Sequence, residues 1–386
     1  MLLFKSCEIF GPQPLGHKDV LMAGKSIVAV ADDIRMPENL GLTVIDCSGF
    51  KMIPGLIDNQ VHIAGAGGEG GPASRTPSIY LSQILEAGVT TVIGCMGTDG
   101  ITRSLEALLM KAKGLRQEGI SAWIYTGSFQ VPTPTLLGDI TKDIALIEEI
   151  IGVGEIAISD HRSFCPTNEE LRRIAAQARL GGMLGGKAGI VKIHMGDARK
   201  PFNPLYQVAQ TSELKLAQFL PTHCNRNHFI FEDALEYGKK GYVDLTAGSY
   251  PYFPDIEIKP STAIKRLLEA SVPLEHITLS SDGMNSLPLF DENGLLVKLE
   301  IGQPRSVFEE LRDTVLQEKI PLEQALKVAT SNVADILWLK NKGRIAPGKD
   351  ADLVVIDDDF HIIHLAAMGQ LMVHNGKMLI KGSYEI

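Results

Sequence analysis

The chain has 386 residues, enough for two or three average domains or for one α/β barrel with a small attached unit. Apolar residues make up 45% and charged residues 22%, a composition that excludes disordered, collagen-like and coiled-coil chains. The formal net charge is −9 and aromatic residues are only 6%, so the basic surface of a nucleic-acid-binding protein is not expected. These figures favour a globular protein that acts on a small molecule.

The cysteines and the lack of long apolar segments bear on the compartment. The five cysteines are widely spaced and form no CxxC pair, so neither a disulfide framework nor a cysteine-based zinc ribbon is indicated. No segment approaches about 18 uncharged apolar residues, and the N-terminal sequence has no small-residue cleavage site. We therefore expect a cytoplasmic protein that is neither secreted nor inserted into a membrane.

Both ends of the chain show the pattern of a small β unit. Residues 1–52 contain short β-rich runs, such as SIVAVA at 26–31 and LTVID at 42–46, separated by Gly, Pro and Asn turns. Residues 343–386 show the same pattern, with Asn-Gly and Lys-Gly turns between short runs. We predict that segments 1–52 and 343–386 together form one small β-sandwich domain.

Residues 53–342 contain eight candidate buried strands with helix-type patterns between them. The strand candidates, in order, are MIPGLIDNQVHI, VTTVIGC, SAWIYTG, IIGVGEIAIS, GIVKIHM, QFLPTH, YVDLTA and ITLSSD. Eight successive βα units are typical of a (β/α)8 barrel. A doubly wound open sheet is the alternative, but no GxGxxG fingerprint follows the first strand. The predicted fold class is therefore α/β, a (β/α)8 TIM-like barrel that carries the β-sandwich.

Polar residues at the predicted strand ends form the candidate site. Barrel enzymes place their catalytic groups at the carboxyl ends of the strands. Here these ends carry Gln60 and His62 on one strand face, then His194, His223 and Asp282. A single strand-end histidine is most often structural. Three of them with an aspartate instead favour a metal site, and imidazole and carboxylate ligands suit zinc.

Charged residues just beyond the strand ends indicate what the site binds. Arg162 and Arg226 each follow a strand end, and Glu69 lies in the glycine-rich loop after the first strand. Guanidinium groups bind carboxylates and a carboxylate binds an ammonium group, so this set fits a small zwitterion with more than one carboxylate. For either arginine, a surface salt bridge is the alternative.

Other reactive residue types are interpreted as structural. Cys224 follows His223 directly and would face away from the site, and Cys95, at a strand end, is assigned a packing role. The remaining histidines are interpreted as surface or structural: His17, His161, His228, His276, His361, His364 and His374.

Over nearly its whole length the sequence resembles the amidohydrolase superfamily, and closely its isoaspartyl (β-aspartyl) dipeptidases. The resemblance is carried by PGLIDNQVHIAGAGGEGGPASRTP, EAGVTTVIGCMGTDGITR, GEIAISDHRS, IVKIHMGD, LPTHCNRN, TLSSDGMNS and PGKDADLVV, in that order. It implies a (β/α)8 barrel with a β-sandwich built from both termini. It also implies hydrolysis of a dipeptide whose peptide bond uses the aspartyl side-chain carboxyl group, and assembly into a homo-oligomer.

The same resemblance assigns roles to individual residues. The implied metal ligands are His62, Glu155, His194, His223 and Asp282. Asp282 is also the implied general base, which takes a proton from the attacking water and passes it to the leaving amine. The implied substrate contacts are Glu69 for the ammonium group, Arg162, Arg226 and Ser286 for carboxylates, and Thr98 nearby.

The chain departs from the family pattern at three positions. Gln60 replaces the first histidine of an HxH pair, Glu155 replaces a carboxylated lysine that bridges two metals, and Phe129 replaces a tyrosine near the scissile carbonyl. A Glu carboxylate ends roughly 3 to 4 Å nearer the backbone than a carboxylated lysine would, so it bridges two metals less easily. We expect one tightly held zinc per chain, with two metals as the alternative.

These departures leave three hypotheses. The first is a zinc hydrolase of β-aspartyl dipeptides or of a related small acidic amide. The second is a one-metal deacetylase or deacylase of N-acyl amino acids, favoured by Glu155, Gln60 and Phe129. The third is a binding homologue with impaired catalysis. Metal content and a panel of isoaspartyl dipeptides and N-acetyl amino acids would separate them. No nucleic-acid or membrane partner is expected.

Overall fold

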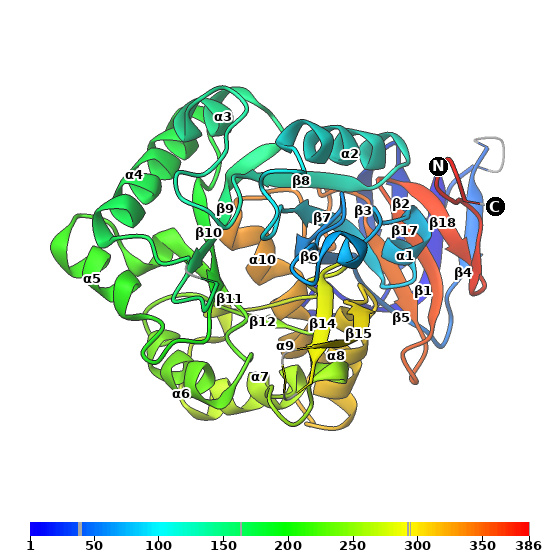
Figure 1. Cartoon of the computed structure of the whole chain (residues 1–386). Coiled ribbons are helices and arrows are strands. Elements are labelled where there is room, and N and C mark those ends of the chain that lie inside the picture. Colours follow the sequence, from blue (N-terminus) through cyan, green and yellow to red (C-terminus); the bar gives the residue numbers. More distant parts are fainter. Residues whose placement is uncertain (38–40, 163, 292, 294, 386) are drawn as a thin grey trace.

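The structure, a computed structural model, describes residues 1–37, 41–162, 164–291, 293 and 295–385. Strands from both ends of the chain share one sheet, which lies beside a larger unit of parallel strands and helices (Figure 1). The N-terminal strands are β1 (Leu2–Phe10), β2 (Pro14–Ala23), β3 (Ser26–Ala31), β4 (Thr43–Asp46) and β5 (Lys51–Pro54). The C-terminal strands are β16 (Leu353–Ile356), β17 (Ile362–Ala367), β18 (Gln370–His374) and β19 (Lys377–Met378).

These nine strands form one continuous sheet. Its order is β19-β18-β17-β16-β5-β1-β2-β3, and β4 also pairs with β1. The two chain ends meet where β5 pairs antiparallel with β16, with Met52 opposite Val355. Side chains from both ends, including Phe4, Ile9 and Leu353, are buried in one cluster. The predicted short runs at 26–31 and 42–46 correspond to β3 and β4.

Eight parallel strands follow, and each lies within one of the eight predicted segments. They are β6 (Leu56–Val61), β7 (Val89–Gly94), β8 (Ser121–Thr126), β9 (Ile150–Ile158), β10 (Ile190–Met195), β11 (Phe219–Thr222), β12 (Val243–Thr246) and β13 (Ile277–Ser280). Strands β6 to β11 form one parallel sheet, and β12 pairs with β13. The ends of this row meet where Val61 forms a parallel bridge with Gly283, just after β13. The arrangement is TIM-like, as predicted.

The helices lie around these strands (Figure 1). They are α1 (Leu81–Leu85), α2 (Leu105–Gln117), α3 (Ile140–Leu146), α4 (Asn168–Gly185), α5 (Asn203–Thr211), α6 (His228–Tyr237), α7 (Pro260–Glu269), α8 (Ser306–Leu316), α9 (Leu322–Ala325) and α10 (Ser331–Ile336). Short 3-10 turns occur at η2 (Pro72–Ser74), η3 (Leu216–Gln218), η4 (Tyr250–Tyr252), η5 (Leu274–His276) and η6 (Leu326–Ala329). Within the described ranges, no helix combines the length and apolarity needed to cross a bilayer.

Local sequence signals set the limits of the long helix α4. The Thr167 hydroxyl accepts a hydrogen bond from the Glu170 backbone, and the Glu170 side chain accepts one from Thr167 in return, which closes a capping box. The helix stops at Gly186, whose φ of 65° is left-handed. Because both limits are encoded locally, α4 holds β9 and β10 at fixed positions behind the site.

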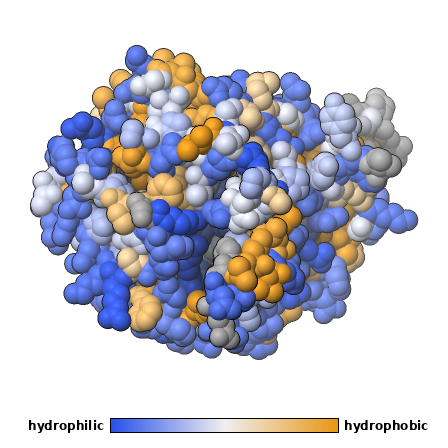
Figure 2. Space-filling view, viewed as in Figure 1, coloured by the Kyte–Doolittle hydropathy of each residue, from blue (hydrophilic) through white to orange (hydrophobic). Residues whose placement is uncertain are grey.

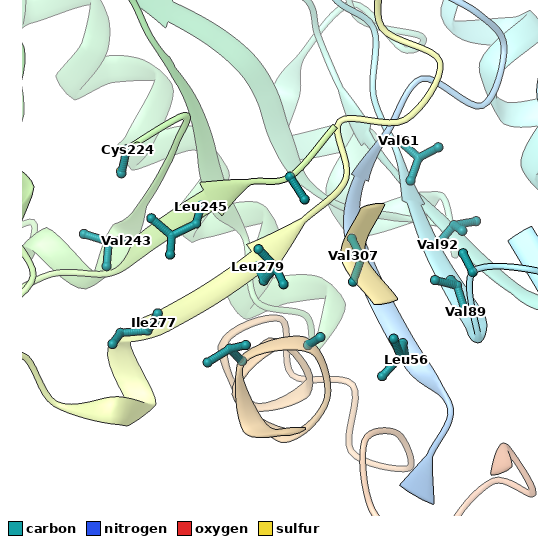
Figure 3. Close-up of a cluster of buried hydrophobic side chains, with 14 of the residues drawn as sticks. Leu56, Val61, Val89, Val92, Cys224, Val243, Leu245, Ile277, Leu279 and Val307 are labelled. Carbon is teal, nitrogen blue, oxygen red and sulfur yellow. The ribbon is translucent and has the colours of Figure 1, made fainter. Parts of the chain in front are cut away.

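Two hydrophobic clusters hold the barrel together. Figure 3 shows part of the larger one, in which Val307 of α8 lies among side chains of β6 and β7. A second cluster joins Ile57 and Leu220, early in their strands, to Val333 of α10. It extends from these early strand positions as far as Cys95, which contacts His62 at the polar strand ends. The site therefore rests on a rigid, close-packed floor.

A buried ion pair completes that floor. Lys192 Nζ lies 2.8 Å from Asp244 Oδ2, and both side chains are fully buried. Asp244 also accepts hydrogen bonds from Asn59 Nδ2 at 2.8 Å and from the Thr222 hydroxyl at 2.7 Å. Satisfied in this way, the two charges avoid the cost of an unpaired buried ion and fix the spacing of β6, β10, β11 and β12.

One element was not predicted. Strands β14 (Ser286–Phe290) and β15 (Leu296–Ile301) form an antiparallel hairpin after β13. Several apolar side chains of β15 are exposed, including Leu296 and Val297. The hairpin begins at Ser286, which lines the cavity at the mouth of the barrel.

The terminal sheet contains a testable acid-sensitive contact. His364 of β17 is 2% exposed and its ring stacks on His374 at 4.9 Å. Burial, with a smaller contribution from His374, lowers the pKa of His364 to about 4. The pKa in the folded state lies below the unfolded value of about 6.5. The contribution of neutral His364 to the free energy of unfolding is therefore complete above pH 6.5 and is lost as the pH falls toward 4. On acidification, we expect His364→Asn to lose less of its free energy of unfolding than the wild type does, by about 2 kcal/mol.

The measurement is the difference in urea stability between pH 7 and pH 5. The exposed His17 provides the matched control, because His17→Asn should keep the wild-type difference. An unchanged difference in His364→Asn would show that another group sets the acid sensitivity.

Candidate metal centre and substrate cavity

The predicted site residues converge on one cavity of about 290 Å³ at the carboxyl ends of the barrel strands. It is lined by all the predicted ligands and substrate contacts: His62, Glu69, Thr98, Glu155, Arg162, His194, His223, Arg226, Asp282 and Ser286. The space-filling view shows a hollow near the centre of this face with hydrophilic residues along it (Figure 2). Residues more than 200 positions apart in sequence thus meet at one place, as parallel strand ends predict.

Glu155, His194 and His223 form a compact three-ligand group. Glu155 Oε1 lies 3.0 Å from His194 Nδ1 and 3.1 Å from His223 Nε2. A tetrahedral zinc with bonds of about 2.0 to 2.1 Å places its ligands roughly 3.3 Å apart, so this spacing fits. Glu155 Oε2 is buried without a hydrogen-bond partner, which is unfavourable unless a cation satisfies it. The residues present therefore fit one metal ion.

The electrostatics of this group match ligand chemistry. Burial raises the pKa of Glu155, but hydrogen bonds from His194 and His223 outweigh it and hold the pKa well below its usual value. Burial also lowers the pKa of His223 to about 4, and the neighbouring His194 acts in the same direction. At neutral pH the site therefore offers a carboxylate and a neutral imidazole, the protonation states that bind a metal.

The partners of each histidine orient its ligand atom. His223 Nδ1 lies 2.8 Å from the Thr246 hydroxyl, which leaves Nε2 facing Glu155. His194 Nε2 lies 3.1 Å from Asp160 Oδ2, which leaves Nδ1 facing Glu155. A carboxylate or hydroxyl on the far ring nitrogen fixes the ring orientation and raises ligand basicity. Asp160 and Thr246 are thus part of the centre, although the sequence analysis did not single them out.

His62, Asp282 and Gln60 form a second group next to the first. His62 Nε2 lies 3.0 Å from Asp282 Oδ1. Gln60 Nε2 donates to Glu155 Oε1 at 2.9 Å and to Asp282 Oδ1 at 3.1 Å, while its carbonyl Oε1 is buried without a partner. The amide nitrogen must face the two carboxylates, because the oxygen would be repelled by them. Gln60 therefore links two carboxylates at the position where the family pattern has a histidine ligand.

Cys95 lies closer to the site than a purely packing role requires. Its Sγ is 3.7 Å from His62 Nδ1, and Cys95, His62 and Glu155 form a second possible group of metal ligands. Burial, however, raises the pKa of the Cys95 thiol to about 11. A protonated thiol is a poor ligand, so the group with His194 and His223 is the better site.

Asp282 is held in a defined orientation. Its Oδ1 faces His62 and Gln60, and Oδ2 accepts a hydrogen bond from Asn285 Nδ2 at 2.7 Å. Burial raises the pKa of Asp282, but the hydrogen bond from His62 and the electrostatic effects of His223 and His62 lower it overall. The side chain is therefore ionised at neutral pH and lines the cavity beside the three-ligand group.

Glu69, Thr98 and Arg162 form the opposite wall. Arg162 binds Asp160 through Nε and Nη2, each at 2.7 Å, and its Nη1 lies 3.2 Å from Glu69 Oε1 and 3.1 Å from the Thr98 hydroxyl. Asp160 thus connects this wall to His194. Its place two residues before Arg162, within SDHRS, was the signal that could have identified it.

Arg226 and Phe129 flank His194. Arg226 Nη1 donates to the Met195 carbonyl at 3.0 Å and lies 3.0 Å from His194 Nε2. The Phe129 ring centre lies 4.2 Å from that of His194, and the Arg162 guanidinium lies 5.0 Å above the Phe129 ring. Phe129 thus faces the cavity at the metal centre with an apolar edge where the family pattern has a hydroxyl.

Comparisons with known proteins agree with this geometry. Residues 216–378 match the amidohydrolase family. A β-aspartyl dipeptidase from Fervidobacterium islandicum, solved in complex with a β-Asp-Leu dipeptide, is 42% identical, with a TM-score of 0.90 and coverage of 98% of both chains. Another structure of β-aspartyl dipeptidase from that organism is 40% identical, with a TM-score of 0.88 and the same coverage. Adenine deaminase 2 of Agrobacterium fabrum is 23% identical over 94% of this chain and 58% of its own length.

The barrel, the strand-end groups and these matches define the class: the protein is a member of the amidohydrolase superfamily. The curated relatives are longer, and the chain spans 58% of the first of them. The match to the β-aspartyl dipeptidase structure, at 42% identity over nearly the whole chain, is more specific than the match to these curated relatives. Within the superfamily, the chain belongs to the β-aspartyl dipeptidase family.

Proposed function

We propose that this protein hydrolyses β-aspartyl dipeptides in a metal-dependent reaction. The observation that carries the proposal is the joint placement of Glu69, Arg162 and Arg226 in the same cavity as Glu155, His194 and His223. One anionic and two cationic side chains thus line the same cavity as one metal-ligand group. This pattern suits a substrate with an ammonium group and two carboxylates, and a family member has been solved with such a ligand, β-Asp-Leu.

We assign one zinc ion to Glu155, His194 and His223. The other group keeps only His62 and Asp282, because Gln60 is engaged with two carboxylates. When bound, a zinc ion acts as a Lewis acid and lowers the pKa of water. Two metals at full occupancy in the native protein would contradict this assignment.

Asp282 is the proposed general base. Its carboxylate is ionised, lines the cavity and is held by His62 and Asn285. It accepts a proton from the attacking water and delivers it to the departing amine nitrogen as the C–N bond breaks. Its fixed orientation suits both transfers.

The walls hold the charged ends of the substrate. Glu69 binds the ammonium group, with Thr98 beside it, and Arg162, Arg226 and Ser286 bind carboxylates. Arg162 Nη1 contacts Glu69 in the structure. When the substrate binds, its ammonium group replaces this guanidinium group as the cation beside Glu69. This contact keeps Glu69 in place before binding.

Glu69→Gln tests the proposal. We expect it to lower kcat/KM for β-Asp-Leu by about 10-fold or more, because a charge-assisted contact worth about 1.5 to 3 kcal/mol is lost. N-acetyl-aspartate lacks the ammonium group, so its hydrolysis should not respond. Glu106→Gln, an exposed position at the start of α2, is the control and should retain wild-type kinetics for β-Asp-Leu.

The alternative function is deacylation of N-acyl amino acids by a one-metal site. It is favoured by the same three departures, Gln60, Glu155 and Phe129. Hydrolysis of N-acetyl amino acids together with no hydrolysis of β-aspartyl dipeptides would replace the first proposal with this one. Absence of bound metal and of both activities would instead favour a binding homologue.

Phe129→Tyr tests the effect of the missing hydroxyl. The Phe129 ring lies at the metal centre, 4.2 Å from the ring of His194. A tyrosine hydroxyl there would donate to the scissile carbonyl, so we expect kcat for β-Asp-Leu to rise by about 10-fold, less than a full oxyanion-hole donor contributes. Phe164→Tyr, whose ring packs on Phe129 at 5.9 Å, is the control. A lower kcat in Phe129→Tyr would show that the substrate carbonyl lies elsewhere.

Further proposals concern the organisation of the protein. The nine-stranded sheet supports treating 1–52 and 343–386 as one β-sandwich domain on the barrel of 53–342. Free cysteines support a reducing compartment, the cytoplasm. We also propose that the chain assembles as a homo-oligomer, as the family resemblance implies; light scattering of the purified protein would test this.

A further inference from the structure

A second cavity, of about 400 Å³, adjoins the substrate cavity. Several residues line both cavities, among them Arg226, Asp282 and Asn285, whereas Glu69 and Arg162 line only the first and Glu257 only the second. If the β-aspartyl group lies against Glu69 and Arg162, the scissile bond lies near Asp282. The residue released by hydrolysis then extends toward the second cavity.

Glu257 gives this cavity its chemical character. It lies on the segment between η4 and α7 and is 9% exposed. Its Oε2 accepts a hydrogen bond from the Ser249 hydroxyl at 2.8 Å, and no contact is seen for Oε1 within the described ranges. Burial raises the pKa of this carboxyl to about 7, against the hydrogen bond from Ser249 and the positive charge of Arg226. The negative charge of Asp282 also raises the pKa of Glu257, by a smaller amount.

The segment that carries Glu257 is fixed to the barrel. The Ile258 backbone donates to the Asn225 carbonyl at 2.9 Å, and Asn225 Nδ2 donates back to the Ile258 carbonyl at 3.0 Å. Asn225 follows β11 and is itself buried. Glu257 therefore stands at a defined place beside the strand end that carries His223.

The other carboxylates of this cavity already have partners. Asp197 pairs with His161 at 3.0 Å, and Asp282 contacts His62 and Asn285. Phe253, Ile256 and Leu287 are the apolar residues of the lining, and neutral polar residues such as Asn227 and Thr246 lie beside them. The cavity thus combines a small apolar surface with one buried, incompletely satisfied carboxyl group, a combination that fits an aliphatic chain ending in a cation.

We propose that the second cavity receives the side chain of the residue released by hydrolysis, and that Glu257 selects β-aspartyl dipeptides in which this residue is cationic, lysine or arginine. The inference rests on the proposed function. Arg226 binds the carboxylate of the released residue, which neutralises its charge. Glu257 then loses the electrostatic support of Arg226, and a cation on the side chain of the released residue takes that place and keeps the carboxylate ionised.

The test compares β-Asp-Lys with β-Asp-norleucine, which has the same aliphatic stem without the ammonium group. For the metal-loaded wild type, we expect kcat/KM for the lysine dipeptide to exceed that for the norleucine dipeptide by about 10-fold, the scale of one charge-assisted contact that is partly screened. Glu257→Gln keeps the shape and the Ser249 contact, so the ratio should fall to near one. Asp255→Asn, an exposed carboxyl two residues away, should keep the wild-type ratio.

A second measurement reads the pocket without turnover. Calorimetry of free L-lysine and L-norleucine should show tighter binding of lysine to the wild type, and no such difference in Glu257→Gln. Equal binding of both amino acids by the wild type, or a preference for lysine that survives in Glu257→Gln, would overturn the inference. Failure to hydrolyse any β-aspartyl dipeptide would overturn the proposed function instead, and the calorimetry would still decide on Glu257.

Discussion

Replacing either His194 or His223 with alanine is expected to release the metal from the purified protein and to end hydrolysis. Both histidines lie within 3.1 Å of Glu155 Oε1, and each has its other ring nitrogen held by a partner. Removing one leaves two protein ligands, and a two-ligand zinc site is weak because zinc prefers at least three protein ligands. We expect the loss of activity to exceed the 10- to 100-fold that follows loss of an outer partner of a ligand.

Metal analysis of the dialysed proteins provides the measurement. The wild type should retain about one zinc per chain, with little remaining in either variant. His228→Ala is the matched control, since this exposed histidine begins α6, a few residues after His223. Full metal content in His194→Ala would show that the ligand group is the alternative one, built from His62, Cys95 and Glu155.

The asymmetry between these two groups explains why one metal is expected. The carboxylated lysine of the family pattern would reach both subsites, whereas Glu155 Oε1 faces His194 and His223 and its Oε2 lies 3.9 Å from His62 Nε2. Gln60 fills the space between Glu155 and Asp282 with an amide nitrogen. That nitrogen donates to one oxygen of each carboxylate and occupies the place of a histidine ligand.

Much of the site followed from the sequence because parallel strands order their ends in space. Once eight βα units were recognised, His62, His194, His223 and Asp282 had to meet at one end of the barrel. The apolar strand cores, such as IIGVGEIAI, identified the strands themselves, and β9 includes Glu155 within its span.

The remaining features depend on side-chain orientation and on contacts between distant segments. The sequence shows Asp160 and Asn285 but not that they hold His194 and Asp282. It gives Gln60 as a lost ligand but not its two hydrogen bonds to carboxylates. The β14–β15 hairpin was missed because its β14 run is short and contains Pro288, which weakens the strand signal. Periodicity reports burial, and it does not report which polar groups face each other.

Asp282→Asn is expected to keep the metal and lower turnover by about 100-fold or more, the scale of a lost general base. Retention of the metal follows from the geometry, because Asp282 is not part of the group formed by Glu155, His194 and His223. The substitution is also structurally mild. An asparagine oxygen can still face His62 and Gln60, and Asn285 can rotate its amide to accept from the new amide nitrogen.

The loss should appear in kcat, since the proton is transferred only as the reaction proceeds. The asparagine amide cannot accept the proton from water or return one to the amine, so both transfers of the proposed mechanism fail together. Binding of β-Asp-Leu, which relies on Glu69 and the arginines, should change little. Unchanged turnover would indicate that Glu155, the other carboxylate at the site, is the general base. As a metal ligand, however, Glu155 would already have its lone pairs engaged. A turnover defect accompanied by metal loss would instead identify Asp282 as a ligand that the three-residue site requires.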